Sequence, residues 1–431
     1  MSAYRLEELG WLGFQRLGEL VMGLEGWTGD ADRVREVLSE GDLTVPGTAA
    51  VLEGPVLVQI VWRRDRTFPE EWSPPERARS RLVICNAERV PERMLGVREL
   101  SALVDARADL RRRLPSLLGL RDFGPLLDAE AVARGSLDVE AACELARVFV
   151  PTRAYAKALE VLDRHRFVVL TGPPEVGKTA IARMIGLAQA TCGWEVHECT
   201  SPQQLWEAFA RERPQLFVAD DAFGSTEYRP DAAERWAREL DRVLHALDDT
   251  HRLIWTSRPA PLRAGLRRVH RERGGERFPA PGEVHVDASQ LDLEEKVSIL
   301  FRHAKASGRV PEIIRDFGAE IVGHPHFTPE RVRRFVSVRL PELLARGDVT
   351  EMMVAEAVEA ELATPTTAMA ASLDALGEEH RALLVALLDA PSGIVTEREL
   401  VSSLRRHHPG LSRPPAELID RLTDHFLKVL P

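Results

Sequence analysis

The sequence predicts an α/β multidomain protein with a parallel sheet core, a helical region after it and a small α/β domain before it. Three observations lead to this prediction. In the middle of the chain, short apolar runs alternate with helical patterns, which is typical of strands buried on both faces of a parallel sheet. From residue 291 onward the pattern is helical. Residues 1–120 differ again, because one amphipathic helix pattern is followed by strand patterns.

The composition sets limits on the class of protein. A length of 431 residues is too great for one typical core, so we expect two to four domains. No apolar run is long enough to span a bilayer, and no N-terminal stretch resembles a signal peptide. The formal net charge of -10 gives no general attraction to nucleic acid or to an anionic membrane. We expect a cytoplasmic protein, because the cysteines show neither metal spacing nor a disulfide pattern: Cys85, Cys143, Cys192 and Cys199.

A glycine-rich stretch, "LTGPPEVGKTAIA" (170–182), lies near the middle of the chain. The apolar run 167–170 before it predicts a buried strand. Residues 178–190 predict a helix, whose apolar stripe is Ile181, Met184, Ile185 and Ala188. Strand, glycine-rich turn and helix are the context that a Walker A motif needs. A chance glycine-rich turn is the alternative, but the motif is complete and its context is right.

This motif predicts a nucleotide phosphate site. Backbone N–H groups of the loop can approach phosphate oxygens, and the helix N-terminus adds partial positive charge. Lys178 would reach the β- and γ-phosphates, and Thr179 would place its hydroxyl on Mg²⁺. The loop residues expected to contact the nucleotide are Gly172, Pro173, Pro174, Glu175, Val176, Gly177, Lys178, Thr179 and Ala180.

Two acidic residues follow the next predicted buried strand, 216–219. Asp220 can hold Mg²⁺ directly or through water, and Asp221 can act as general base toward the attacking water. A further strand pattern, 251–258, ends in Arg258, which we expect near the γ-phosphate because ligands sit at the carboxyl ends of parallel strands. A surface salt bridge is the alternative for Arg258. Two more strands, expected within 194–200 and 282–287, complete five.

The segments "LTGPPEVGKT", "FVADDAFG" and "IWTSR" together resemble the STAND class of signalling ATPases, which are relatives of AAA+ and NB-ARC proteins. The flanking segments "FVPTRAY", "HPHFTPERVRRFV" and "LEEKVSILFRHAKASG" resemble, more narrowly, the third novel STAND subgroup of bacteria. The resemblance runs from about residue 103 to the end. It implies a P-loop NTPase core with a helical subdomain and a winged helix.

The resemblance also implies an ATP/ADP switch that hydrolyses ATP slowly with Mg²⁺ and self-associates on activation. In such proteins a segment before the first strand and a Gly-x-Pro in the helical subdomain flank adenine. The matching positions are Val150, Pro151, Arg153 and, in "GHPHFT", Gly323, His324 and Pro325. Read from the residues alone, Pro325 could simply end a helix.

The C-terminal part predicts several helices. Residues 293–308 place Val297, Leu300, Phe301 and Ala304 on one stripe, with Gly308 as the C-cap. Thr328 is expected to cap the next helix, with Pro329 at its first position. The basic cluster on that helix could touch phosphate or nucleic acid, but it is interpreted as a solvated face: Arg331, Arg333 and Arg334.

Residues 372–410 and the helix pattern after them have the order of a winged helix, with Thr396 as an N-cap. The basic residues 405–408 could read DNA, but a structural winged helix fits the STAND resemblance better. The pattern stops at Pro431 without an obvious wing. We therefore expect either a shortened form that lacks a downstream sensor region, or a small variant.

The N-terminal pattern of helix, hairpin, strand and helix resembles the Mrr type of restriction-endonuclease fold. Such a nuclease needs an Asp and then a Gln or Glu, one residue and a Lys. Gln59 matches, but Val61 stands at the Lys position, Gln15 replaces the helix Glu, and Asp42 is the only upstream candidate. We expect an inactive nuclease-like domain that makes contacts with a partner.

The expected domains are an endonuclease-like domain, a helical linker, the NTPase core, a helical subdomain and a winged helix: 1–120, 121–150, 151–288, 289–370 and 371–431. The predicted function is a bacterial STAND ATPase in antiphage defence or stress signalling, triggered by an unknown protein or phage component. The alternatives are an ATP-dependent restriction nuclease and a transcription regulator that binds DNA; a P-loop kinase is disfavoured. The overall charge does not favour nucleic acid as a partner.

Overall fold

The computed structural model divides into two compact units. The first comprises Met1–Thr152, Met184–Trp194 and Asp292–Val322, and the second comprises Arg153–Arg183, Glu195–Leu291 and Gly323–Pro431. Across the described residues, we find no helix with the length and apolar character needed to cross a membrane. The structure describes residues 4–22, 48–53, 56–62, 80–88, 90, 94–224, 230–259, 261–263, 265–266, 281–308, 312–347, 349–363, 373–374, 376–388, 395–422 and 427.

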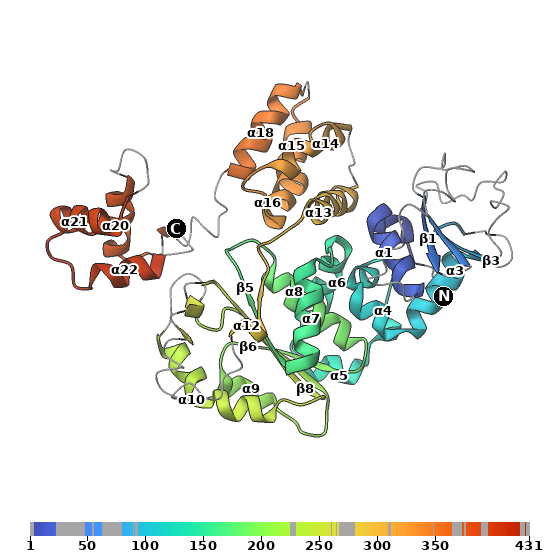
Figure 1. Ribbon diagram of the computed structural model, residues 1–431, viewed down its shortest axis with the longest axis horizontal. Helices are drawn as coiled ribbons and strands as arrows, with labels where there is room; N and C mark the ends of the chain where they lie inside the picture. Colours follow the sequence, from blue (N-terminus) through green and yellow to red (C-terminus); the bar gives the residue numbers. More distant parts are fainter. Residues whose placement is uncertain are drawn as a thin grey trace. The chain divides into compact units, whose positions relative to one another are not determined.

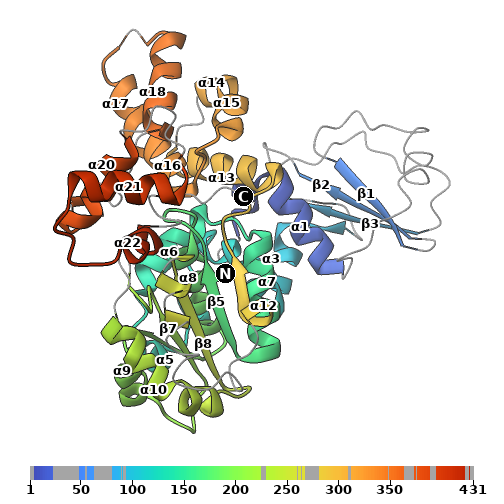
Figure 2. The ribbon, with the colours of Figure 1, turned by 60° about the vertical axis from the view of Figure 1, so that its left-hand side comes forward.

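The first unit begins with a helix beside a small sheet (Figure 2). The sheet order is β1-β2-β3-β4, with β1 and β2 antiparallel and the other neighbours parallel. Helix α1 approaches β2 closely because Gly18 has no side chain; a Cβ there would lie 2.6 Å from Ile60 Cδ1. The expected order of helix, hairpin, strand and helix is present. The elements are η1 (Leu6–Leu9), α1 (Gly10–Met22), β1 (Thr48–Glu53), β2 (Val56–Val61), β3 (Ser80–Cys85), β4 (Met94–Leu95) and α3 (Val97–Ala106).

The remaining helices of the first unit extend its core. Apolar residues of α1, α3, α4 and η2 pack with Ile60 and Ile84 from the sheet. Helix α13 contacts α1, η1 and α6. These helices are α4 (Ala108–Arg113), η2 (Pro115–Gly119), η3 (Gly124–Leu126), α5 (Ala129–Arg134), α6 (Val139–Val148), α13 (Leu293–Ala306), α14 (Glu312–Asp316) and α15 (Gly318–Gly323).

The buried face of α13 differs from the predicted stripe. Val297 is 43% exposed, whereas Arg302 is 3% exposed. The guanidinium of Arg302 donates to the backbone oxygens of Glu8 (2.6 Å) and Ala146 (3.2 Å), so hydrogen bonds compensate for its burial. Apolar periodicity could not indicate this, because a charged residue occupies a core position. The C-cap is Ser307, one residue before the predicted Gly308, which follows it with a φ of 68°.

The second unit contains a five-stranded parallel sheet in the order β6-β7-β8-β5-β9. Figure 1 labels three of these strands, β5, β6 and β8. Helix α7 packs against β5, β8 and β9, and α9 packs against β6. Three strands expected from apolar runs are present as β5, β7 and β8. The elements are α7 (Arg153–His165), β5 (Phe167–Thr171), β6 (Glu195–Cys199), α9 (Pro202–Ala208), β7 (Gln215–Ala219), α10 (Pro230–Ala246), β8 (His251–Ser257) and β9 (His285–Asp287).

One expected strand is shorter than predicted. Residues Pro281–Val284 form a helical turn, α12, and only His285–Asp287 pair with β5. The physical reason is Pro281, whose fixed φ and missing N–H suit the first position of a helix.

The C-terminal part of the second unit is helical. Thr328 and Thr396 cap helices as predicted, because their hydroxyls accept from the backbone N–H groups of Arg331 and Glu399 (both 3.3 Å). The last three helices share an apolar core (Figure 1). The elements are α16 (Pro329–Arg334), η4 (Phe335–Arg339), α17 (Leu340–Leu344), α18 (Glu351–Ala363), α20 (Glu378–Leu388), α21 (Glu397–His407) and α22 (Pro415–Leu422).

Candidate functional site

The loop after β5 runs into α8 (Lys178–Ala190), as the glycine-rich motif predicts. Gly172 and Gly177 have φ values of 145° and 96°, which L-residues rarely adopt. Space is also tight at the first position, since a Cβ on Gly172 would lie 3.1 Å from Val176 Cγ2. Glu175 has a φ of 72° although it is not glycine. Backbone strain of this kind is concentrated at functional sites.

Lys178 folds back over its own loop. Its Nζ donates to the backbone oxygens of Gly172 (2.9 Å) and Pro173 (2.7 Å), and the residue is 8% exposed. Burial lowers the pKa of Lys178 to about 8, although the carboxylates of Asp221 and Asp220 act in the opposite direction. The amine is therefore held where the loop backbone turns, with acceptors that a phosphate oxygen could replace.

Thr179 and Asp220, the two residues predicted to hold a metal ion, are in direct contact. The Thr179 hydroxyl donates to Asp220 Oδ1 at 3.0 Å. Thr179 is the second residue of α8, and Asp220 follows β7 directly. Hydroxyl and carboxylate oxygens are the hard ligands that Mg²⁺ prefers, so the side chains at this position fit the ion.

Thr256, near the end of β8, joins the two acidic residues. Its hydroxyl donates to Asp220 Oδ1 and accepts from the backbone N–H of Asp221 at 2.9 Å. Asp221 itself has a φ of 47°. The sequence interpretation passed over Thr256 as a contact of these carboxylates and gave the strand-end role to Arg258. The sequence feature that could have indicated this contact is a hydroxyl residue near the end of β8, the strand that pairs with β7.

Arg258 follows β8 directly. Burial lowers its pKa, while the carboxylates of Asp221 and Glu175 oppose this effect. The structure therefore brings Arg258 into the same group of charges as the loop and the strand-end acids. The charges of Asp220, Asp221 and Arg258 all act on Lys178 across this edge of the sheet.

The prediction of a solvated face is wrong for Arg331 on α16. Arg331 is 8% exposed, and its Nε donates to Glu175 Oε2 in the loop at 3.2 Å. The same guanidinium donates to the backbone oxygens of Leu362 and His326. Burial raises the pKa of Glu175, and the charge of Arg331 opposes this rise. A tertiary partner explains the difference, because the two residues lie 156 positions apart.

The residues expected near adenine fall in three places. Arg153 begins α7 and is exposed; Pro325 follows α15 and is also exposed. Between α15 and Pro325, His324 is 7% exposed and accepts from the backbone N–H of His326 at 3.2 Å through Nδ1. Its Nε2 therefore carries the proton and donates to Glu359 at 3.1 Å.

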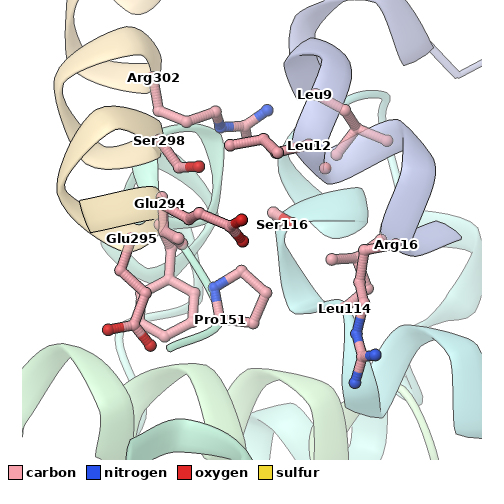
Figure 3. Close-up of a pocket in the computed structure, with 13 residues that line it drawn as sticks. Leu9, Leu12, Arg16, Leu114, Ser116, Pro151, Glu294, Glu295, Ser298 and Arg302 are labelled. Carbon is pink, nitrogen blue, oxygen red and sulfur yellow. The ribbon is translucent and has the colours of Figure 1, made fainter. Parts of the chain in front are cut away.

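Val150 and Pro151 line a pocket of about 140 Å³ that lies within the first unit (Figure 3). Its other walls come from α1, from the segment around Ser116 and from α13. The carboxylate of Glu294 and the hydroxyl of Ser298 point into it. A cavity of this size suits a group about as large as benzene. Among the described residues, Arg302 contributes a buried Nε that has no hydrogen-bond partner.

The predicted nuclease residues are only partly covered by the structure. Gln15 lies on α1 and donates to Glu19 at 3.0 Å. Gln59 and Val61 lie on β2, opposite Val83 and Cys85 of β3. Asp42 lies outside the described residues. Most of the arginine-rich stretch 263–277, which follows β8 in the sequence, also lies outside them.

Comparison with family models matches residues 149–306 to Novel STAND NTPase 3. This segment contains all five strands of the parallel sheet, the loop and both strand-end acids. The match supports a P-loop NTPase of the STAND class for this part of the chain.

A comparison with solved structures finds partial matches. A Walker-type ATPase of Pyrococcus abyssi is 16% identical, with 64% of this chain and 89% of that one covered and a TM-score of 0.41. Domain III of the Thermotoga maritima replication initiation protein DnaA is 16% identical, with 55% and 99% covered and a TM-score of 0.36. AMPPCP-bound DnaA from Aquifex aeolicus is 16% identical, with 67% and 90% covered and a TM-score of 0.31. No curated protein matches the chain.

Proposed function

We propose that this protein is an ATP/ADP-controlled STAND signalling switch with slow, Mg²⁺-dependent ATP hydrolysis. The observation that carries the proposal is the hydrogen-bonded group of Thr179, Asp220 and Thr256 beside the glycine-rich loop. It lies at the carboxyl edge of a parallel sheet, where α/β proteins bind ligands. The family match covers the same residues.

The residues divide the chemistry of hydrolysis among them. The loop N–H groups and Lys178 bind the phosphates, and Lys178 exchanges its two carbonyl acceptors for phosphate oxygens. Thr179 and Asp220 would hold Mg²⁺, which neutralises phosphate charge when bound. Asp221 orients the attacking water and accepts its proton. Water attacks the γ-phosphorus, the bond to the β,γ-bridging oxygen breaks, and Arg258 stabilises the negative charge that develops.

The nucleotide state would control the arrangement of the modules. ATP and ADP can shift a conformational equilibrium only as far as their contacts differ between the two states. We propose Val150, Pro151, Arg153 and Pro325 as the neighbours of adenine. The proposed output is self-association in antiphage defence or stress signalling.

We further propose that residues 1–120 form a nuclease-like domain without nuclease activity, which makes contacts with a partner. Val61 stands where such a nuclease needs Lys, and Gln15 bonds to Glu19 within its own helix. A Mg²⁺-dependent plasmid cleavage assay on the full chain tests this. Cleavage by the wild type that is lost in Gln59→Ala would favour the restriction-nuclease alternative.

The test of the switch is the nucleotide itself. The full chain is purified and denatured, and any released nucleotide is identified by chromatography. We expect ADP or ATP to be released. We also expect calorimetry on the nucleotide-stripped protein to show association with both. A well-folded, stripped protein that binds neither nucleotide would contradict the proposal.

A further inference from the structure

The ion pair between Glu175 and Arg331 places a carboxylate inside the loop that is proposed to bind phosphate. The two side chains are 6% and 10% exposed, and Arg331 Nε lies 3.2 Å from Glu175 Oε2. Both residues belong to the second unit. A negative charge so near the phosphates would weaken their binding unless a cation compensates for it.

The position of Arg331 is set by helices and not by the loop. Its backbone N–H donates to the capping hydroxyl of Thr328 at the start of α16. Its guanidinium also donates to the backbone oxygen of Leu362, in the last turn of α18, where carbonyls have no partner within the helix. The cation that compensates for Glu175 therefore moves with α16 and α18.

The backbone of the loop gives a second reason to assign a role to Glu175. Its φ of 72° would suit glycine without strain, whereas a glutamate there is disfavoured. The side chain occupies this position at an energetic cost, and it accepts a hydrogen bond from Arg331.

We propose that Glu175 makes nucleotide affinity conditional on the docking of α16. While Arg331 covers the carboxylate, the loop accepts phosphate; when α16 moves away, the carboxylate loses this cation and repels phosphate, and nucleotide is released. This proposal rests on the proposed function. Two unit charges roughly 6 Å apart, at an effective dielectric constant of about 20, change a binding constant by roughly 100-fold.

A double-mutant cycle on the full chain tests the proposal, with ATP and ADP dissociation constants measured by calorimetry. Arg331→Gln should weaken the binding of both nucleotides by roughly 10- to 100-fold, because it removes the cation that pairs with Glu175. Glu175→Gln alone should tighten binding by roughly threefold, because residual negative charge is removed. The double variant should bind within about threefold of Glu175→Gln, because no carboxylate remains to be covered.

Recovery of nucleotide affinity in the double variant distinguishes this mechanism from a direct contact between Arg331 and phosphate. If Arg331 bound the phosphate itself, the double variant would stay as weak as Arg331→Gln, and that result overturns the proposal. Unchanged affinity in Arg331→Gln overturns it as well. If Arg331→Gln does not fold, the comparison of Glu175→Gln with the double variant still decides.

Arg333→Gln is the matched control. Arg333 lies on the same helix, and its ion pair is with Glu330 of that helix and not with the loop. This variant should bind both nucleotides within about threefold of the wild type, and thermal unfolding shows whether each variant is folded. Loss of affinity equal to that of Arg331→Gln would mean that the helix, and not the charge on Glu175, is responsible.

A wild type that binds no nucleotide overturns the proposed function and this inference with it. Normal wild-type binding without rescue overturns only the inference.

Discussion

The charged residues at the carboxyl edge of the five-stranded sheet contrast with those at the end of α21. At the sheet edge, Lys178 is buried and bonded to its loop, and Asp220 receives hydrogen bonds from two hydroxyls. On α21, Arg405 and Arg406 are exposed to solvent. The same types of charge therefore occupy environments of very different polarity.

The difference teaches that local sequence indicates where charges lie along the chain but not what surrounds them. Helices α16 and α21 illustrate this, because both are capped by a threonine and carry arginines in the last turn. Arg331 on α16 is buried against the loop, whereas Arg405 on α21 remains in water. Fixed, partly desolvated charges interact strongly, and exposed charges interact weakly.

The largest effect is expected for Lys178→Ala. ATP affinity should fall about 100-fold or more, because a buried cation that faces phosphate is lost. Calorimetry measures the affinity, and circular dichroism confirms that the chain remains folded. Lys157→Ala is the control, since that lysine is exposed and pairs with Glu160 on its own helix. Normal ATP affinity in Lys178→Ala would discredit the phosphate site.

Asp221→Asn should separate binding from turnover. ATP should stay bound, while phosphate release slows by roughly 100-fold, the usual scale for loss of a positioned base. Asparagine tolerates the left-handed backbone at this position, so the loop geometry is retained. Asp231→Asn, an exposed carboxylate on α10, should leave phosphate release unaltered. Unchanged turnover in Asp221→Asn would assign the base to another group.

The smallest effect is expected for the double variant Arg405→Ala/Arg406→Ala. Its nucleotide affinity should match that of the wild type, and its free energy of unfolding should change by about 0.5 kcal/mol or less. Fluorescence anisotropy with duplex DNA at two salt concentrations sharpens the comparison. Salt-dependent DNA binding by the wild type that the variant loses would favour the transcription-regulator alternative.

Strong local signals made much of the nucleotide-binding fold predictable. Apolar runs marked β5, β7 and β8, and the glycine-rich motif marked the loop and the helix after it. The sequence also placed Thr179 and Asp220 at one edge, and the structure has them in contact. Their roles toward nucleotide and metal stay predictions.

The rest depended on contacts between distant parts of the chain. Thr256 contacts both strand-end acids only because β8 lies beside β7. Local sequence patterns do not predict the order of strands in a sheet. Arg331 reaches a loop residue 156 positions away. Val297 was expected inside because apolar spacing was the guide, whereas hydrogen bonds to carbonyls allow Arg302 to take the buried face.

The hydrogen bonds from Arg302 to the backbone oxygens of Glu8 and Ala146 have a practical consequence for the design of shorter fragments. A fragment that begins at residue 121 keeps the carbonyl of Ala146 but loses that of Glu8, and it uncovers the Phe301 ring, which approaches Gly10 closely. The buried guanidinium of Arg302 would then lose one of its two backbone acceptors. Such a truncated chain would be prone to precipitate, so biochemical work on the isolated core should retain the N-terminal helix.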